Sequence, residues 1–250
     1  MIETFEHRGA PVLRMTHGKA NALDIEFCAE MVERIEALTR EGAPGFILTG
    51  RGSIFSAGVD LVRAGAGGAP YMHDFLPVLA RAFEVLFFYP GPVITAINGH
   101  AVAGGCIIAC AGDVRLLVRS GATIGVPELA VGVPFPAFAL ETVRFATGSK
   151  RFQDLIYGAR TFQGEEALDR GLADRLVDAD ALLDQSAAEL ARLNTIPRHT
   201  FEITKRQLRF PARQVCEQMA AAYDATVFEA WGHPKTLESV RAYAARMLKK

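Results

Sequence analysis

The stretch PVITAINGHAVAGGCIIACAGD, residues 92–113, decides the fold of this chain. An apolar run typical of a buried strand ends at Ile97, and small residues lead from it into a second apolar run with helical character. Gly104 and Gly105 stand where this helix should begin, although glycine weakens a helix by about 1 kcal/mol relative to alanine. The position therefore has a reason to keep its backbone bare.

Strands and helices alternate in the sequence up to about residue 120, which indicates an α/β core. Asp24 is the expected N-cap of a helix that runs to about Arg40. The other expected elements of this half are a hairpin over residues 2–15 that turns at Gly9, strands at 45–50, 93–98 and 114–118, a glycine-rich loop at 51–70, and helices at 71–88 and up to 111.

The second half of the chain is expected to be a loop over residues 125–136 and then mostly helical. From about residue 196 the helical pattern is amphipathic, so this tail packs either on its own core or on a neighbouring subunit. Its expected apolar anchors are Phe201, Ile203, Leu208, Met219 and Val227.

Composition narrows the class of protein. Of the 250 residues, 50% are hydrophobic, which is enough to bury a sizeable core. The net charge is −1, so the chain lacks the excess of basic residues typical of a nucleic-acid-binding protein. No apolar run is long enough to span a membrane, and the first residues resemble neither a signal nor a transit peptide. The four cysteines and six histidines lack metal-ligand spacing, so we expect no metal, buried free thiols and a cytoplasmic location.

Two turns share one pattern. SIFSAGVDL (residues 53–61) follows one expected strand, and GHAVAGGC (residues 99–106) follows another. Small residues there leave backbone N–H groups accessible, and two such groups aimed at one point form an oxyanion hole. The alternative is that these glycines only permit a sharp turn or close helix packing.

The order and spacing of several motifs resemble the crotonase superfamily, the enoyl-CoA hydratase/isomerase family. They are GKANALD, FSAGVDL, INGHAVAGGCIIACAGDVRL, IGVPELAVGVP and FQGEEALDRGLADRLVD. The resemblance implies an α/β fold, a crotonase-like spiral of ββα units with a helical C-terminal oligomerisation region. It further implies a core with the acyl-CoA site over residues 1–195, a trimerisation region over 196–250, and homotrimers or homohexamers. The ligand would be an acyl-CoA thioester, with no separate cofactor.

The resemblance also assigns site residues. Lys19, Asn21 and Ala22 match the region that holds the adenine and phosphates of CoA, and Asp60 and Leu61 flank the same pocket. Ala57 and Gly104 match the two N–H donors that hold the thioester oxygen.

In this family, two glutamate positions distinguish the hydratase reaction from the isomerase reaction. Hydratases of the family hold a water between two glutamates, and here Ile107 occupies the first position while Glu128 occupies the second. An apolar loop around Glu128 would raise its pKa, which suits a general base. Moving a double bond needs one base, so we expect a 3-enoyl-CoA to 2-enoyl-CoA isomerase. A hydratase, another acyl-CoA reaction and a non-catalytic acyl-CoA-binding protein remain alternatives.

Two further expectations concern the ends of the ligand. Phe135 and Phe138 follow the loop proline, where hydratases commonly carry glycines, and are candidate walls of the acyl pocket. Arg246, Lys249 and Lys250 form a basic C-terminus that either contacts CoA phosphates or is a solvated tail.

Overall fold

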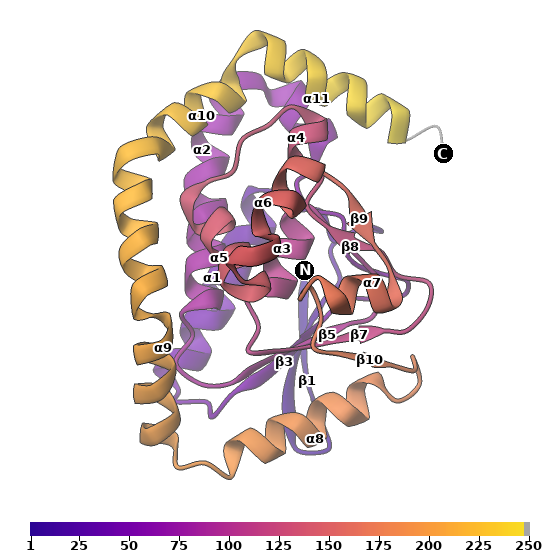
Figure 1. Ribbon diagram of the computed structural model, residues 1–250, viewed down its shortest axis with the longest axis vertical. Helices are drawn as coiled ribbons and strands as arrows, with labels where there is room; N and C mark the ends of the chain where they lie inside the picture. The colour runs from indigo at the N-terminus through magenta and orange to yellow at the C-terminus, as the bar shows by residue number, and fades with distance from the viewer. Residues whose placement is uncertain (248–250) are drawn as a thin grey trace.

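The computed structural model describes residues 1–247 and contains two β-sheets surrounded by helices (Figure 1). The larger sheet has six strands in the order β1-β2-β3-β5-β7-β10. The β1–β2 hairpin is antiparallel, and the pairs that follow it are parallel. Its strands are β1 (Ile2–His7), β2 (Ala10–Met15), β3 (Phe46–Thr49), β5 (Val93–Ile97), β7 (Val114–Val118) and β10 (Arg175–Val177).

The smaller sheet has four short strands in the order β4-β6-β8-β9. They are β4 (Ile54–Ser56), β6 (His100–Val102), β8 (Ile124–Gly125) and β9 (Thr161–Phe162). β4, β6 and β8 are parallel to one another, so their carboxyl ends share one edge of the sheet.

A repeated unit links the two sheets. β3, β5 and β7 of the larger sheet are each followed by a strand of the smaller sheet and then by a helix: β3–β4–α2, β5–β6–α3 and β7–β8–α4. The helices are α2 (Leu61–Phe87), α3 (Gly104–Cys110) and α4 (Glu128–Val131). These are the expected ββα units, and they bring three strand-to-helix turns to one place.

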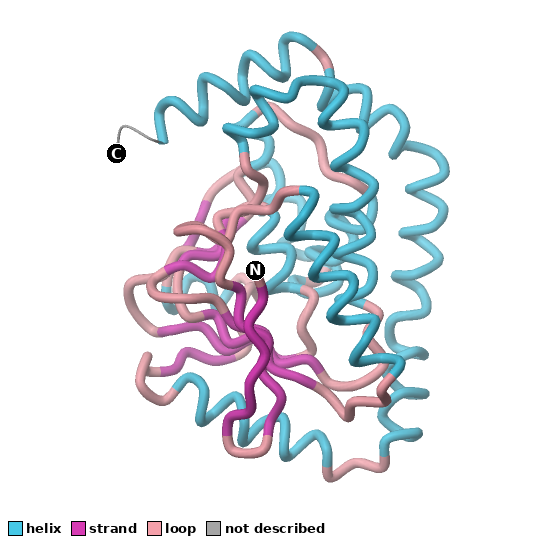
Figure 2. The backbone as a smooth tube through the Cα atoms, turned by 180° about the vertical axis from the view of Figure 1, so that it is seen from behind, coloured by secondary structure: helices cyan, strands magenta, loops and turns pink. Residues whose placement is uncertain are grey.

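The remaining helices cover the sheets. α1 (Ile25–Arg40) begins at Asp24, whose carboxylate accepts a hydrogen bond from the Phe27 N–H, as expected. Figure 2 shows the strands grouped in the lower half of the molecule with helices around and above them. The other helices are α5 (Ala137–Thr147), α6 (Ser149–Gly158), α7 (Gly164–Asp169), α8 (Leu182–Asn194), α9 (Arg198–Met219), the π-helical turn η1 (Ala220–Asp224), α10 (Ala225–Gly232) and α11 (Pro234–Met247).

The expected loop over residues 51–70 is wrong for its second half, because α2 already begins at Leu61. Asp60 caps this helix by accepting a hydrogen bond from the Arg63 N–H (2.9 Å), and the helix kinks at Gly68, where φ is 63°. Packing outweighs the weak helix propensity of glycine here. A Cβ atom on Gly65 would lie 2.9 Å from Cγ of Arg241, so the glycine lets α11 approach α2 closely.

The C-terminal helices fold back over the core, with α9 along one side and α10 and α11 packed on α2 (Figure 1). Phe201 and Val227 pack against the core as expected, whereas Ile203 and Leu208 are 54% and 65% exposed. The face of α9 that is buried carries Lys205, Arg209, Ala212 and Cys216 instead. Sequence hydropathy could not reveal this, because the buried face includes two charged side chains.

Residues 1–247 contain no disulfide bond, because all four cysteines are free and buried. No cluster of three or more acidic, histidine or cysteine side chains is arranged to hold a metal ion in this part of the chain. Over the same residues, no helix combines the length and apolar character that crossing a membrane requires.

Candidate active site

A cavity of about 490 Å³ lies where the strand-to-helix turns meet. The turns after β4, β6 and β8 contribute Val59, Gly104 and Glu128, and the loop before α5 contributes Phe135. Most other lining residues are aliphatic or aromatic, which describes an apolar pocket with a few polar groups, the usual character of a small-molecule site.

The two glycine turns contact each other. A Cβ atom on Gly58 would lie 2.7 Å from the carbonyl oxygen of Val102 and 2.9 Å from the N atom of Gly104. Gly58 also has a φ of 80°, a conformation that favours glycine. The glycines therefore permit a sharp turn and close packing, and this packing places two turns of backbone beside one cavity.

The N–H donor expected at Ala57 is not available, because it donates to the carbonyl oxygen of Ala20 (2.9 Å). Two residues later, Val59 forms a parallel bridge to Leu23 in which the neighbours of Val59 make the hydrogen bonds. The N–H of Val59 itself therefore points away from Leu23. Among the described residues, neither this N–H nor that of Gly104 has a hydrogen-bond partner, and both residues line the cavity.

The prediction of Ala57 as a donor is therefore wrong, and Val59 is the residue of this turn whose N–H has no acceptor among residues 1–247. Ala57 lines the cavity, but its N–H is engaged elsewhere. The signal in the sequence was Gly58: its positive φ reverses the direction of the chain, so the accessible N–H follows the glycine rather than preceding it.

Glu128 is the first residue of α4 and is 6% exposed. Burial raises the pKa of Glu128 to about 8, opposed by a backbone hydrogen bond. Its Oε2 atom is buried and has no hydrogen-bond partner within residues 1–247. A carboxylate in this state is costly to keep charged, and it can bind a proton near neutral pH.

Ile107 lies on α3, is 3% exposed and lines the same cavity. Of the carboxylates in the described part of the chain, only Glu128 and Asp60 line this cavity. Asp60 is engaged as the N-cap of α2, through the Arg63 N–H. The structure therefore places one uncommitted carboxylate beside an apolar wall.

The residues expected to hold CoA separate into two groups. Ala22, Asp60 and Leu61 line the cavity, whereas Asn21 and Lys19 do not. Asn21 is buried with a φ of 46° and joins two segments, accepting from the His17 N–H and donating to the carbonyl oxygen of Phe55. Its role here is to hold the turn before α1.

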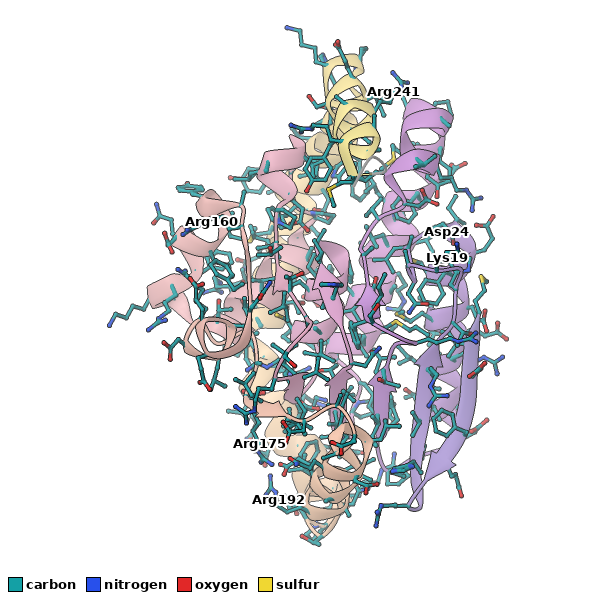
Figure 3. All side chains as sticks on the ribbon, turned by 90° about the vertical axis from the view of Figure 1, so that its right-hand side faces the viewer. Lys19, Asp24, Arg160, Arg175, Arg192 and Arg241 are labelled. Atoms are coloured by element: carbon teal, nitrogen blue, oxygen red, sulfur yellow. The ribbon has the colours of Figure 1, made fainter. Side chains whose placement is uncertain are left out.

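Lys19 is exposed and precedes α1, and Figure 3 labels it on the same side of the molecule as Asp24. It lies next to the turn that carries Ala22, on the outer surface. From the outer surface Lys19 can contact the part of a ligand that extends out of the cavity, but Lys19 does not line the cavity itself.

Of the two expected aromatic walls, Phe135 lines the cavity and Phe138 does not. Phe138 is partly buried and packs edge-on against Phe88, with ring centroids 6.3 Å apart. The expectation for Phe138 is corrected accordingly. Residue 138 lies within α5, where the helical repeat turns it away from Phe135 and toward α2.

The C-terminal helices also line the cavity. The predicted division at residue 195, which placed the whole acyl-CoA site in the N-terminal core, did not include them. Trp231, Tyr243 and Met247 line the cavity, and the Trp231 indole donates to the carbonyl oxygen of Pro134 (2.9 Å). Arg246 lies over the Tyr243 ring, 5.4 Å from its centroid. Lys249 and Lys250 lie outside the described residues.

Comparison with known proteins identifies similar sequences. Enoyl-CoA delta isomerase 1, mitochondrial, from Rattus norvegicus is 29% identical over 212 residues, covering 84% of this chain and 73% of that protein. A putative enoyl-CoA hydratase from Thermus thermophilus is 32% identical over 192 residues, covering 75% of each.

Solved structures show the same fold. Human mitochondrial delta3-delta2-enoyl-CoA isomerase superposes with a TM-score of 0.93 at 23% identity, covering 99% of this chain and 98% of that one. An enoyl-CoA hydratase from Mycobacterium marinum gives 0.79 at 26% identity, covering 90% and 98%. The enoyl-CoA hydratase/isomerase family matches residues 7–248. This chain therefore belongs to the enoyl-CoA hydratase/isomerase family and has the crotonase fold.

Proposed function

We propose that this protein is a 3-enoyl-CoA to 2-enoyl-CoA isomerase that uses Glu128 as its single base. The observation that carries the proposal is the state of Glu128, which is buried and has no partner for Oε2 among the described residues. It lines the same cavity as Ile107, which stands at the position where a hydratase would need its second carboxylate to hold a water. An isomerase needs only one group that removes and returns a proton.

The reaction would proceed through an enolate. The Glu128 carboxylate removes a proton from C2 of the 3-enoyl thioester, and the electron pair of that C–H bond moves through the thioester to its oxygen. The resulting dienolate takes the proton back from Glu128 at C4, which leaves the double bond between C2 and C3. No atom is gained or lost, so the site needs no water and no cofactor.

The N–H groups of Val59 and Gly104 would hold the thioester oxygen while its charge develops. One donor of this kind contributes about 2.7–4 kcal/mol to transition-state stabilisation, and a positioned base contributes about 10²–10⁴-fold. The apolar cavity strengthens both effects, because electrostatic interactions are stronger where water is excluded.

The test is a paired assay on the purified protein. One arm supplies a 3-enoyl-CoA and follows the absorbance of the conjugated 2-enoyl thioester that forms. The other arm supplies a 2-enoyl-CoA and follows the loss of that absorbance as water adds. We expect activity in the first arm; activity in the second arm alone would contradict the proposal.

A hydratase is the second candidate, supported by the name of the Thermus thermophilus relative. It would require another group to activate water in place of Ile107. An acyl-CoA-binding protein without turnover would show activity in neither arm but would bind CoA.

We also propose a homo-oligomer, a trimer or a hexamer. The support is the outer face of α9, where Ile203 and Phe210, seven residues apart along the helix, are both more than half exposed. Apolar residues gathered on one exposed face indicate a protein contact. Sedimentation of the wild type and of Ile203→Glu tests this, with a shift to monomers expected for the variant and an unchanged mass contradicting it.

A further inference from the structure

His100 gives the cavity a polar group that the proposed reaction does not use. The polar side chains of the lining are Asp60, His100, Thr123, Glu128, Trp231 and Tyr243. Asp60 caps α2 and the Trp231 indole donates to a carbonyl oxygen, so both have fixed partners. His100 and Thr123 form a pair of their own at the amino ends of β6 and β8.

The hydrogen bonds of this pair fix the imidazole. The backbone N–H of Thr123 donates to Nδ1 of His100 (3.1 Å), and the Thr123 hydroxyl lies 2.9 Å from the same nitrogen. A backbone N–H can only donate, so Nδ1 must be the acceptor nitrogen. In the neutral ring the proton is then on Nε2, which is a donor and has no partner among residues 1–247.

The position of His100 along β6 relates it to the rest of the site. His100 and Val102 are two residues apart on one strand, so their side chains share a face, and both line the cavity. Two residues of a strand span about 6.6 Å. Beyond Val102 the chain turns into Gly104, so the imidazole lies on the amino-terminal side of the turn that would hold the thioester oxygen.

We propose that Nε2–H of His100 donates a hydrogen bond to a carbonyl oxygen of the bound acyl-CoA. This inference rests on the proposed acyl-CoA ligand and concerns how it is positioned. Two parts of such a ligand carry this chemistry: the amide carbonyls of the pantetheine arm, and a carbonyl on an oxidised acyl chain. His100 is therefore a binding residue that selects for an oxygen at a fixed distance from the thioester.

Two variants separate the two ring nitrogens. The amide of His100→Gln can place a donor near Nε2, whereas the amide of His100→Asn stays near Nδ1 and the Thr123 partner. We expect His100→Gln to behave like the wild type and His100→Asn to weaken binding about 5-fold, the size of one neutral hydrogen bond. A role in holding Thr123 alone would give the opposite order.

The ligands then locate the oxygen. The dissociation constant of CoA itself is measured by calorimetry, and kcat/KM is measured for 3-hexenoyl-CoA and for a 3-enoyl-CoA with a ketone farther along its chain. A contact with pantetheine weakens all three in His100→Asn. A contact with the acyl chain affects the ketone substrate alone.

Equal behaviour of the two variants with every ligand would overturn the inference. So would a loss in His100→Gln that His100→Asn does not share. Failure of the wild type to bind CoA at all is a different result, because it would overturn the proposed function rather than the role of His100.

Discussion

Two acidic side chains of this molecule, Asp113 and Glu128, are held in opposite ways. Asp113 accepts hydrogen bonds from the Val93 N–H (2.8 Å), from Lys205 Nζ (2.6 Å) and from Arg209 Nη2 (2.8 Å). We call these three side chains, Asp113, Lys205 and Arg209, the Asp113 cluster. Glu128, in the apolar cavity, leaves Oε2 with no partner in the described chain.

A carboxylate that is paired, like Asp113, stabilises the structure, whereas an unpaired carboxylate such as Glu128 is free to exchange a proton. The Asp113 cluster ties α9 to the ends of α2 and α3, since Arg209 also donates to the carbonyl oxygens of Phe87 and Ala111. Burial lowers the pKa of Lys205 to about 8, against the opposing attraction of Asp113. Glu128 has no such attraction, so its pKa rises and it can exchange a proton.

The largest expected effect is on turnover. Glu128→Gln removes the base but keeps the shape of the side chain, so we expect kcat for isomerisation to fall by about 10²–10⁴-fold. The dissociation constant of CoA should stay at the wild-type value, which calorimetry measures. A variant that retains kcat within about tenfold of the wild type would show that Glu128 is not the base.

The next effect is on stability. Asp113→Asn leaves Lys205 and Arg209 buried without their counter-charge, so we expect the free energy of unfolding in urea to fall by about 3–5 kcal/mol. Asp178→Asn is the control, because Asp178 is 77% exposed and pairs with Arg119 at 3.6 Å. Such a surface pair contributes about 0–1 kcal/mol. Equal losses in the two variants would remove the distinction between the Asp113 cluster and the surface.

A second effect on stability, of similar size, should appear in its pH dependence. The folded-state pKa of Glu128, about 8, lies above its ordinary value of 4.5, so the native protein holds this proton more tightly than the unfolded chain. Stability present at low pH is therefore lost as pH rises from about 4.5 to about 8. Urea unfolding at several pH values should show this loss in the wild type relative to Glu128→Gln. Parallel curves for the two proteins would contradict the raised pKa.

The smallest expected effect comes from giving Glu128 an acidic neighbour. Ile107→Glu adds a second carboxylate at the wall of the cavity, and we expect a measurable rate of water addition to a 2-enoyl-CoA. Ile107→Gln is the matched control, with the same size but no charge. If both variants hydrate equally, a polar residue suffices and a second carboxylate is not what separates the two reactions.

Much of this arrangement could be predicted from the sequence because it depends on local pattern. The buried strands, the N-cap at Asp24 and the glycine turn before α3 follow from periodicity and capping rules. Glu128 is assigned through the family resemblance, and its apolar surroundings predict the rise in pKa that burial produces.

The rest depends on contacts between distant segments. Whether Ala57 or Val59 offers a free N–H is decided by hydrogen bonds to Ala20 and Leu23, more than thirty residues earlier. The contribution of Trp231 and Tyr243 to the cavity depends on how α10 and α11 fold back over α2. The local sequence pattern predicts neither of these features. Hydropathy also could not predict the buried charged side chains of α9, because it assigns charged residues to the exposed face.

The central claim is that Glu128 acts as an unpaired base with a raised pKa. The most direct measurement is the pH profile of kcat/KM for a 3-enoyl-CoA, which reports ionisations of the free enzyme. Activity needs the deprotonated carboxylate, so we predict that kcat/KM rises with pH, reaches half of its maximum near the pKa of about 8 and levels off roughly one pH unit or more above it. A profile that is already level above pH 5 would place the pKa of the base near its ordinary value of 4.5 and contradict the account.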